Sequence, residues 1–430
     1  MFEYRLKNSP IIPDSDTYMQ DYLERLGVRK YTSFLKEPAE EDQISPFLLD
    51  RMEEAVTMLY KHIEKNSSIF LVVDSDVDGY SSAAIMHSFI KDLNPDVDIV
   101  YYIHPEKEHG VVTSEVPYST DLVIIPDAGS NQYEELKELE SKGMDVLVLD
   151  HHIVDDGEMY ISNHVVIVNN QISHRFKNKN LSGAGVVYKF VQAYCERHNL
   201  DYYEDYTDLA ALGIISDMML ITELDNNYII KKGLGDVHNK MFKALLNKQS
   251  YSVTSTTNPN IIDIAFYISP IINGTIRMGS MQDKINLYEA FVDNDDYEVY
   301  SREWRGEVIE ENLYDKVARE SYNIKEKQNR VTLKTMERIC NVIETEELYK
   351  NQIIIYKTSK ENANEVPKSL TGLVAMKISA KYNRPTLILR PVVEGDKTYF
   401  RGSGRGKKME GFPSFKDFLT NSNIVDYAQG

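Results

Sequence analysis

The chain has 430 residues, of which 42% are hydrophobic and 27% are charged. This composition excludes a disordered, collagenous or low-complexity chain, and at roughly 100–200 residues per domain it predicts two or three domains. The 67 acidic residues outnumber the 48 lysines and arginines. The resulting net charge of −19 counts against a nucleic-acid binder and against a protein that spreads on anionic membranes.

Cys195 and Cys340 are the only cysteines, so the sequence offers no disulfide framework and favours a reducing compartment. No apolar run approaches the roughly 18–20 residues that cross a bilayer. The first residues, MFEYRLKNSPIIPDSD, lack the basic and then apolar layout of a signal peptide. We therefore expect a cytoplasmic protein that does not bind membranes.

Short apolar runs alternate with helical patterns in the first half of the chain. The runs expected to form buried strands are Ile69–Val73, Val97–Ile103, Leu122–Pro126, Val146–Leu149 and Val165–Val168. The expected helices are Pro46–Lys65, Ser81–Leu93, Gln132–Lys142, Gly183–His198 and Asp205–Ser216. This alternation predicts an α/β fold with a parallel sheet that is covered by helices on both faces.

The second half begins with a highly charged stretch, Ser301–Lys350, which favours long exposed helices that connect two bodies. A smaller α/β pattern follows it. The expected order is a strand at Gln352–Tyr356, a helix at Leu370–Tyr382, a strand at Pro385–Leu389 and a glycine-rich turn at Gly402–Gly406.

Carboxylates and histidines stand where several of these elements end. Three expected strands and one helix are followed by Asp74, Asp76 and Asp78, by Asp127, by Asp150, His151 and His152, and by Asp217. Ligands bind at the carboxyl edge of an open parallel sheet, and carboxylates that converge there repel one another unless cations compensate. Oxygen-rich ligands with one or two imidazoles suit Mg²⁺ or Mn²⁺. Two ions about 3.5–4 Å apart would hold a phosphate, generate a hydroxide and stabilise the leaving oxygen.

Simpler explanations exist for each segment alone. A single Asp after a strand is usually a helix N-cap or a turn residue. The segment Asp74–Gly79 is also similar to the start of an EF-hand loop, but position 12 of that loop would be Ile85 instead of Glu. The recurrence of acidic residues at successive strand ends favours a shared site.

These motifs together resemble the DHH phosphoesterase superfamily, and within it the RecJ-type single-strand-specific exonucleases. The matching segments are ISPFLLDRMEEAV, LVVDSDVDGYSSAAI, VIIPDAGSN, LVLDHH, VIVNNQISHRFKNKNLSGAGVVYKF, ALGIISDMM and SPIINGTIRMG. The later segments LTGLVAMKISAKYNRPTLIL and FRGSGRG resemble a DHH-associated C-terminal domain. The resemblance implies a lead-in at 1–65, a catalytic domain at 66–300, a helical connector at 301–350 and a substrate-binding domain at 351–430, with the active site in the cleft between the two domains.

The resemblance also implies roles for single residues. The implied metal ligands are Asp76, Asp78, Asp127, His151 and Asp217, with Asp74 as a ligand directly or through water. Asp127 would bridge two ions of Mn²⁺ or Mg²⁺. His152 would stabilise charge on the scissile phosphate, and Asp150 would orient the histidines, as carboxylates beside ligating imidazoles commonly do.

Substrate contacts are implied in two further regions. They are Asn273 and Arg277, and then Arg401, Gly402, Ser403, Gly404, Arg405 and Gly406. Glycines let backbone N–H groups approach phosphate, and arginine can grip it with two hydrogen bonds. The chain departs from the family pattern at Gly406, where a serine is usual, at Lys377, where an arginine is common, and at Tyr102–Val112, which lacks the usual arginine.

The expected function is a metal-dependent hydrolase of phosphodiester bonds, a RecJ-like exonuclease that degrades single-stranded DNA from 5′ to 3′ in repair or recombination. One alternative keeps the chemistry on short oligonucleotides, pAp or a cyclic dinucleotide. The other is a non-catalytic partner of replication or repair proteins, and such a protein partner is also compatible with the enzyme.

Overall fold

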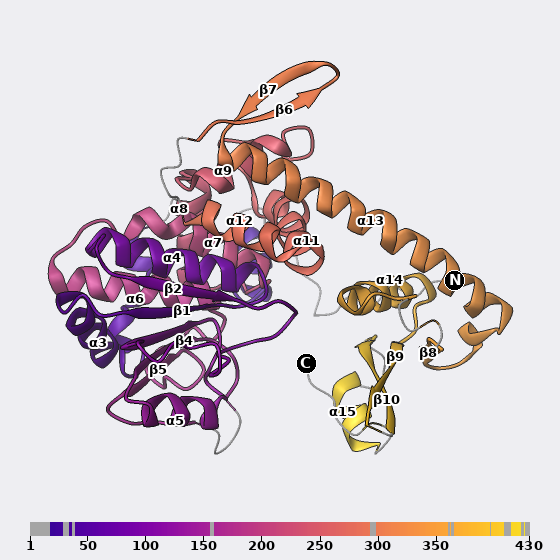
Figure 1. Ribbon diagram of the computed structural model, residues 1–430, viewed down its shortest axis with the longest axis horizontal. Coiled ribbons are helices and arrows are strands. Elements are labelled where there is room, and N and C mark those ends of the chain that lie inside the picture. Colours follow the sequence, from indigo (N-terminus) through magenta and orange to yellow (C-terminus); the bar gives the residue numbers. More distant parts are fainter. Residues whose placement is uncertain are drawn as a thin grey trace. The chain divides into compact units, whose positions relative to one another are not determined.

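The computed structural model describes residues 18–28, 34–36, 39–154, 159–292, 298–359, 362, 365–395, 397–407, 414–422 and 425 (Figure 1). The chain forms two compact units, Met1–Tyr322 and Asn323–Gly430. The boundary between them lies inside a long helix, α13 (Leu313–Thr345). Each unit is described below by itself.

A five-stranded, wholly parallel sheet with the order β2-β1-β3-β4-β5 organises the first unit. Its strands are β1 (Ile69–Val73), β2 (Ile99–Ile103), β3 (Leu122–Pro126), β4 (Asp145–Asp150) and β5 (Val165–Asn169). Each of them matches an apolar run of the sequence to within two residues at either end. The predicted α/β fold with a parallel sheet is confirmed.

Strands β1, β3, β4 and β5 are fully buried, which explains why they are continuous apolar runs, whereas the edge strand β2 is partly exposed. Alternate strand residues such as Leu71 and Ile124 face a large core that they share with helices α3 (Met52–Glu64), α4 (Val77–Leu93), α6 (Gly183–His198) and α7 (Thr207–Ser216). The residues between them, such as Val72 and Val123, face a smaller core closed by α5 (Tyr133–Ser141). Figure 1 shows α4 and α6 on one side of the sheet and α5 on the other.

Further helices complete the first unit around this sheet. They are α1 (Tyr18–Arg25), α8 (Leu224–Gly235), α9 (Lys240–Lys248), α10 (Ile261–Asp263), the π-helical segment η4 (Ile264–Ile268), α11 (Ser269–Met278) and α12 (Met281–Phe291). The short 3₁₀ turns of this unit are η1 (Glu40–Asp42), η2 (Pro46–Leu48) and η3 (Tyr203–Tyr206).

One helical stretch among the described residues, Ile261–Met278, could cross a membrane by length and composition alone. It comprises α10, η4 and α11. Half of it is buried inside the protein, as is common for a core helix.

The charged segment after residue 300 is not helical from its start, as the sequence had suggested. It begins as a hairpin of β6 (Tyr300–Trp304) and β7 (Glu307–Glu311), and only then continues as α13. The two loop residues, Arg305 and Gly306, both have positive φ, at 54° and 84°. A two-residue loop of this kind matches the right-handed twist of a hairpin, and this local geometry outweighs the charge pattern.

The second unit contains a three-stranded sheet with the order β10-β9-β8. Its strands are β8 (Ile354–Lys357), β9 (Thr386–Glu394) and β10 (Lys397–Arg405), and its elements also include η5 (Leu348–Lys350), η6 (Lys368–Leu370), α14 (Thr371–Tyr382) and α15 (Phe415–Asn421). The expected smaller α/β region at the end of the chain is therefore present. The finer division at residues 65, 300 and 350 stays a prediction.

The glycine-rich segment Gly402–Gly406 is not the turn that the sequence suggested. Gly402 and Gly404 lie within β10 and pair with Leu389 and Leu387 of β9. The chain reverses earlier, after Glu394, where Gly395 has a φ of 58°. A Cβ atom at position 402 would lie 1.8 Å from the carbonyl oxygen of Ile388, so this glycine allows two strands to approach closely.

Candidate metal centre

The order of the sheet explains why the acidic residues meet. The chain leaves β1 toward β2 on one side, whereas β3, β4 and β5 follow on the other side, so the topology reverses between β1 and β3. Ligands of open α/β sheets bind in the crevice at such a switch point, outside the carboxyl ends of the strands. Asp74 follows β1, Asp127 follows β3, and Asp150 ends β4.

The Asp74–Asp78 segment turns from β1 into α4. Asp76 is the N-cap of α4, and its carboxylate accepts a hydrogen bond of 3.1 Å from the backbone N–H of Gly79. Asp78 lies in the first turn of this helix and is buried. Its two oxygens accept hydrogen bonds of 2.7 and 3.0 Å from the backbone N–H groups of Gly183 and Ala184 at the start of α6. A helix N-terminus stabilises negative charge, so α6 helps to hold this carboxylate.

Asp127 has the left-handed conformation, with a φ of 62°, directly after β3. Its backbone N–H still donates to the carbonyl of Leu149, at 2.8 Å. Asp and Asn enter this region more readily than most residues, and such strain is common at functional sites. Within the residues that the structure describes, the buried Oδ1 atom of Asp127 has no hydrogen-bond partner.

His151 connects the carboxylates that come from different elements. Its Nε2 atom lies 3.2 Å from Oδ1 of Asp127, 3.8 Å from Oδ2 of Asp78 and 3.7 Å from Oδ2 of Asp217. The groups whose ligand atoms all lie within 4.8 Å of one another are Asp78–His151–Asp217, Asp74–Asp76–Asp127 and Asp127–His151–His152. The first two of these groups contain all the predicted metal ligands. The contact between Asp127 and His151 joins them.

Asp150 lies beside this cluster and holds both histidines. Its Oδ1 atom accepts from the backbone N–H groups of His151 and His152, at 2.7 and 3.1 Å, and contacts Nδ1 of the His152 ring at 2.8 Å. Its Oδ2 atom accepts from the backbone N–H of Ser130, at 3.0 Å. The orienting role that the resemblance implies for Asp150 stays a prediction, and these contacts place its carboxylate against both histidines. They leave Nε2 of His152 directed away from Asp150, on a side chain that is 51% exposed.

The acidic side chains of the centre repel one another. Burial, followed by the charges of Asp78, Asp76 and Asp74, raises the pKa of Asp127 well above its ordinary value. Burial also raises the pKa of Asp78, and burial with the charges of Asp78 and Asp76 raises the pKa of Asp217 to about 7. Without a cation, this arrangement disfavours the charged form of all three carboxylates.

The pair Asp150–His152 behaves in the opposite way. Burial by itself would raise the pKa of Asp150, but the hydrogen bond and charge of His152 outweigh it and hold this pKa well below its ordinary value. The same hydrogen bond raises the pKa of His152 to about 9. At neutral pH the ring of His152 is therefore a cation at the edge of the cluster.

The residues fit a pair of divalent cations. A cation would stabilise a buried carboxylate oxygen that forms no hydrogen bond, and carboxylates whose pKa values are raised by burial and mutual repulsion. The donor set of carboxylates and one or two imidazoles suits Mn²⁺ or Mg²⁺ better than a structural zinc site.

Comparison with known proteins agrees with this geometry. Residues 68–214 match the DHH family, N-terminal domain. This part of the chain is similar to that family. It contains the whole parallel sheet and all the clustered side chains except Asp217, which lies three residues beyond the match.

Two curated relatives extend the similarity beyond this part of the chain. The first is YorK of the SPbeta prophage in Bacillus subtilis, which is named as a single-strand DNA-specific exonuclease. It is 34% identical over 382 residues, which are 89% of this chain and 65% of YorK. The single-stranded-DNA-specific exonuclease RecJ of Bacillus subtilis is 24% identical over 395 residues, which are 90% of this chain and 46% of RecJ. The chain therefore spans less than two thirds of the length of either relative.

Solved structures show the same fold. The crystal structure of exonuclease RecJ bound to manganese matches with a TM-score of 0.63 at 21% identity, over 79% of this chain and 80% of that one. RecJ from Thermus thermophilus in complex with Mn²⁺ matches with a TM-score of 0.64 at 21% identity, over 88% of this chain and 52% of that one.

Two glycines leave room for the carboxylates of the cluster. A Cβ atom at Gly183 would lie 2.2 Å from Oδ1 of Asp127, and one at Gly213 would lie 2.2 Å from Oδ1 of Asp78. Helices α6 and α7 can therefore approach the carboxyl edge of the sheet only because these positions have no side chain.

The predicted substrate-binding residues fall in both units. Asn273 and Arg277 lie on α11 of the first unit, and Oδ1 of Asn273 is buried without a hydrogen-bond partner among the described residues. Arg401, Gly402, Ser403, Gly404 and Arg405 lie on β10 of the second unit, and Gly406 follows it. Ser403 Oγ contacts Thr371 Oγ1 at 2.9 Å, which ties β10 to the start of α14. A Cβ at Gly372 would lie 3.0 Å from Nη2 of Arg405, so the Arg405 guanidinium lies over the same helix start.

His109 is a contributor that the sequence analysis did not assign to the site. Its Nδ1 atom contacts Oδ2 of Asp74 at 2.7 Å, and the backbone N–H of Gly110 donates to Oδ1 of Asp74 at 3.1 Å. The loop after β2 thus holds both oxygens of Asp74. The position of His109 in the sequence could have indicated this contact. It lies in the loop after β2, and a loop that follows a strand of this sheet begins at the same carboxyl edge.

Proposed function

We propose that this chain is a Mn²⁺- or Mg²⁺-dependent exonuclease that hydrolyses single-stranded DNA from the 5′ end. The observation that carries the proposal is the group of carboxylates around His151, in which the buried Oδ1 atom of Asp127 forms no hydrogen bond. Relatives named as single-strand DNA-specific exonucleases, and RecJ structures that contain Mn²⁺, support the substrate and the metal.

We assign the cation-holding role to Asp76, Asp78, Asp127, His151 and Asp217, with Asp74 held beside them by His109. Two such ions, when bound, supply Lewis acidity toward a phosphate and lower the pKa of a water.

The chain's own residues supply positioning and charge. Asp150 orients the ring of His152, whose raised pKa keeps it cationic at neutral pH. A fixed cation at this place stabilises the negative charge that develops on a phosphodiester during hydrolysis. We assign phosphate binding to Asn273 and Arg277 and to residues 401–406, on the basis of their resemblance to family segments. The free thiol state of both cysteines supports a reducing compartment such as the cytoplasm.

The decisive experiment incubates the purified protein with a long single strand labelled at its 5′ or its 3′ end, in Mn²⁺, Mg²⁺ or EDTA. We expect mononucleotides to be released from the 5′ end only when a metal is present. Asp127→Asn should lose at least about a hundredfold of the rate, because it removes the carboxylate that joins the two ligand groups. Asp236→Asn, at a carboxylate that is 79% exposed on the surface, is the matched control and should retain the rate.

Three outcomes would redirect the proposal. Wild-type activity in Asp127→Asn would overturn the metal assignment. Cleavage confined to di- to pentanucleotides or cyclic dinucleotides would assign the chain to the small-substrate alternative. Absence of hydrolysis with every metal, together with copurification of a replication or repair protein, would favour the non-catalytic partner.

A further inference from the structure

Exposed apolar side chains lie on a helical stretch that packs against α7, the helix that ends directly before Asp217. The stretch Ile261–Met278 presents Phe266 at 69% exposure, Ile262 at 63% and Tyr267 at 39%. Scattered apolar residues are normal on a protein surface, but a group on one helix indicates a binding face. The group lies on the π-helical segment η4 and the turn before it, and π-helical insertions occur frequently at functional sites.

A hydrogen bond links this helix to the metal centre. Ser269, the first residue of α11, contacts Ser216 through their Oγ atoms at 2.6 Å, and Ser216 directly precedes Asp217. Helix α7 also packs against η4. Three carboxylates contact His151. The side chains of Asp78 and Asp127 are 3% and 2% exposed, whereas that of Asp217 is 37% exposed. The cluster therefore opens to solvent at Asp217.

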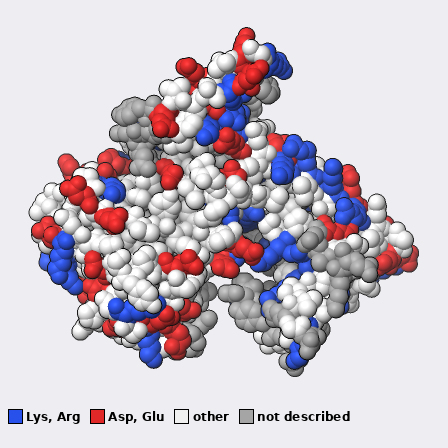
Figure 2. Space-filling view, in the orientation of Figure 1, with Lys and Arg blue, Asp and Glu red and all other residues white. Residues whose placement is uncertain are grey.

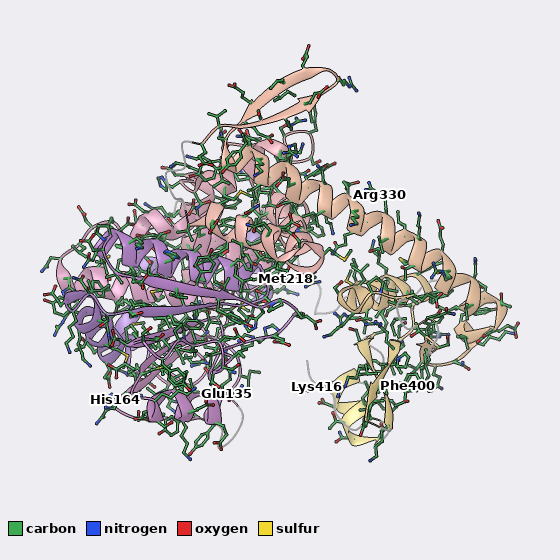
Figure 3. The ribbon with its side chains drawn as sticks, in the orientation of Figure 1. Glu135, His164, Met218, Arg330, Phe400 and Lys416 are labelled. Atoms are coloured by element: carbon green, nitrogen blue, oxygen red, sulfur yellow. The ribbon has the colours of Figure 1, made fainter. Side chains whose placement is uncertain are left out.

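The residue after Asp217 continues the same surface. Met218 is 84% exposed and has a φ of 57°, a conformation that is strained for an unbranched side chain other than Asn or Asp. It lies on the loop after α7, and Figure 3 labels it. An apolar side chain is thus held out into solvent one residue away from a proposed metal ligand.

The charge of this helix sets it apart from the rest of the chain. The net charge is −19, yet Ile261–Met278 contains a single acidic residue, Asp263. Asp263 is buried and bonded to Asn260 and Thr254 in the cap of α10. No carboxylate of this helix therefore faces an approaching phosphate backbone, and the basic residue of the same stretch, Arg277, lies on it near its end.

The predicted substrate contacts Asn273 and Arg277 lie further along the same helical stretch, on α11, which directly follows η4. Both are half-buried, whereas Ile262, Phe266 and Tyr267 are exposed. An aromatic surface beside groups suited to phosphate is the combination that binds unpaired nucleotides.

We propose that Phe266 and Tyr267 form a stacking platform on which the unpaired bases of a single strand lie as its backbone passes to the metal centre. The proposal rests on the proposed nuclease function and adds the basis of its strand selectivity. Bases of a duplex are paired and stacked inside the helix, so their faces are not available to protein rings. A single strand exposes those faces, and stacking is tolerant of sequence because every base has a π-face.

The test measures binding, so that it does not depend on hydrolysis. The Asp127→Asn protein would be titrated, with Mn²⁺ present, into fluorescent oligothymidine and into an abasic strand of equal length with the same phosphates. Adding Phe266→Ala and Tyr267→Ala should weaken binding to oligothymidine about fivefold or more for each ring. Binding to the abasic strand, which has no bases to stack, should change by less than about twofold.

The control is Tyr251→Ala, which removes a fully exposed ring outside this helix and should alter neither affinity. An equal loss of affinity for both strands would overturn the platform, because it would show a general structural effect. An unchanged affinity for oligothymidine would also overturn it. Sedimentation of the wild-type protein with phosphatidylcholine–phosphatidylglycerol vesicles, abolished by the two alanines, would also overturn it and assign this face to a membrane.

The platform and the nuclease can fail separately. Hydrolysis of single strands by wild type that the two alanines leave unchanged would remove the platform and keep the nuclease. Base-dependent binding by a protein that hydrolyses nothing would keep the platform and remove the nuclease.

Discussion

At the scale of single residues, Asp150 is a buried carboxylate that contacts the histidines of the cluster, and we expect it to support the site without binding a metal. Its two oxygens are occupied by three backbone N–H groups and one imidazole, so they have little capacity left for a cation. The carboxylates Asp78, Asp127 and Asp217, whose pKa values are raised, are the ones that a cation would stabilise.

Asp150→Asn should therefore reduce kcat by about 10- to 100-fold while Mn²⁺ affinity changes less, because the ring of His152 loses its charged partner. The measurement is kcat and Mn²⁺ affinity for the single variants and for Asp150→Asn with His152→Ala. We expect the double variant to be no slower than His152→Ala alone. Losses that multiply would show that Asp150 acts independently of His152.

Gly213 tests the close packing around Asp78. Gly213→Ala places a Cβ 2.2 Å from Oδ1 of Asp78 and 2.5 Å from Cβ of Ala184, so we expect a loss of about 1–3 kcal/mol in the free energy of unfolding and weaker Mn²⁺ binding. Gly235→Ala is the control, because a Cβ there would have no neighbour within 4 Å. Denaturant unfolding of both variants checks this, and equal stabilities would contradict the packing argument.

At the scale of elements, the two edges of the parallel sheet have different tasks. The carboxyl edge gathers the metal centre, and the amino edge carries Asp145 at the start of β4. Asp145 contacts Lys61 and His62 at 2.8 Å each and His164 at 2.6 Å. Figure 3 labels His164, which lies directly before β5. The network around Asp145 joins α3, β4 and the segment before β5 without contacting the metal centre.

Asp145 predicts a pH dependence that is separate from catalysis. Burial would raise its pKa, but hydrogen bonds from Lys61, His164 and His62 outweigh burial and lower the pKa to about 2. The carboxylate therefore adds stability above its unfolded pKa near 4, and this stability is lost as the pH falls toward 2. Asp145→Asn should cost about 2 kcal/mol at pH 7 and much less near pH 2.

Urea unfolding of wild type and Asp145→Asn across this pH range provides the measurement. Mn²⁺ affinity, measured on the folded variant, should be unchanged. A stability difference that does not shrink in acid, or a loss of Mn²⁺ binding, would contradict this division of tasks between the edges.

At the scale of the whole molecule, the charge of −19 does not describe every surface. Figure 2 shows acidic and basic side chains interspersed over the visible face, with lysine and arginine along α13. Lys327, Arg330 and Lys334 of that helix are at least partly exposed. Part of the acidity is concentrated in the cluster around His151, whose ligand atoms lie close enough together to hold a metal ion.

This concentration predicts how metal affects folding. Mn²⁺ should raise the free energy of unfolding of the wild type, by about 2.7 kcal/mol at a concentration about 100 times its Kd, because it binds the folded cluster and relieves the repulsion. In EDTA, Asp127→Asn should be at least as stable as the wild type, since it removes a buried carboxylate whose pKa is raised. Calorimetry with and without metal tests both expectations, and an equal Mn²⁺ gain in Asp127→Asn would contradict them.

The sequence by itself determined the strands and the acidic positions at their ends. A buried parallel strand must be a short continuous apolar run, and the first polar residue after it must lie at the carboxyl edge, so the pattern alone was sufficient to place Asp74, Asp127 and Asp150. Hydrophobic periodicity and charge composition predict less well where local backbone geometry sets the structure. For that reason the β6–β7 hairpin and the strand β10 were not predicted.

Only the tertiary structure decided which side chains meet. The contact of His109 with Asp74 depends on the path of a loop, and the exposure of Phe266 depends on which side of its helix the core covers. The surroundings of Asp127 and Asp78 depend on helices from distant parts of the chain, which approach these carboxylates at Gly183 and Gly213 respectively. The local pattern of apolar and polar residues specifies a strand or helix and the polar residues at its ends. The distance between two side chains from different elements is set by packing over the whole unit.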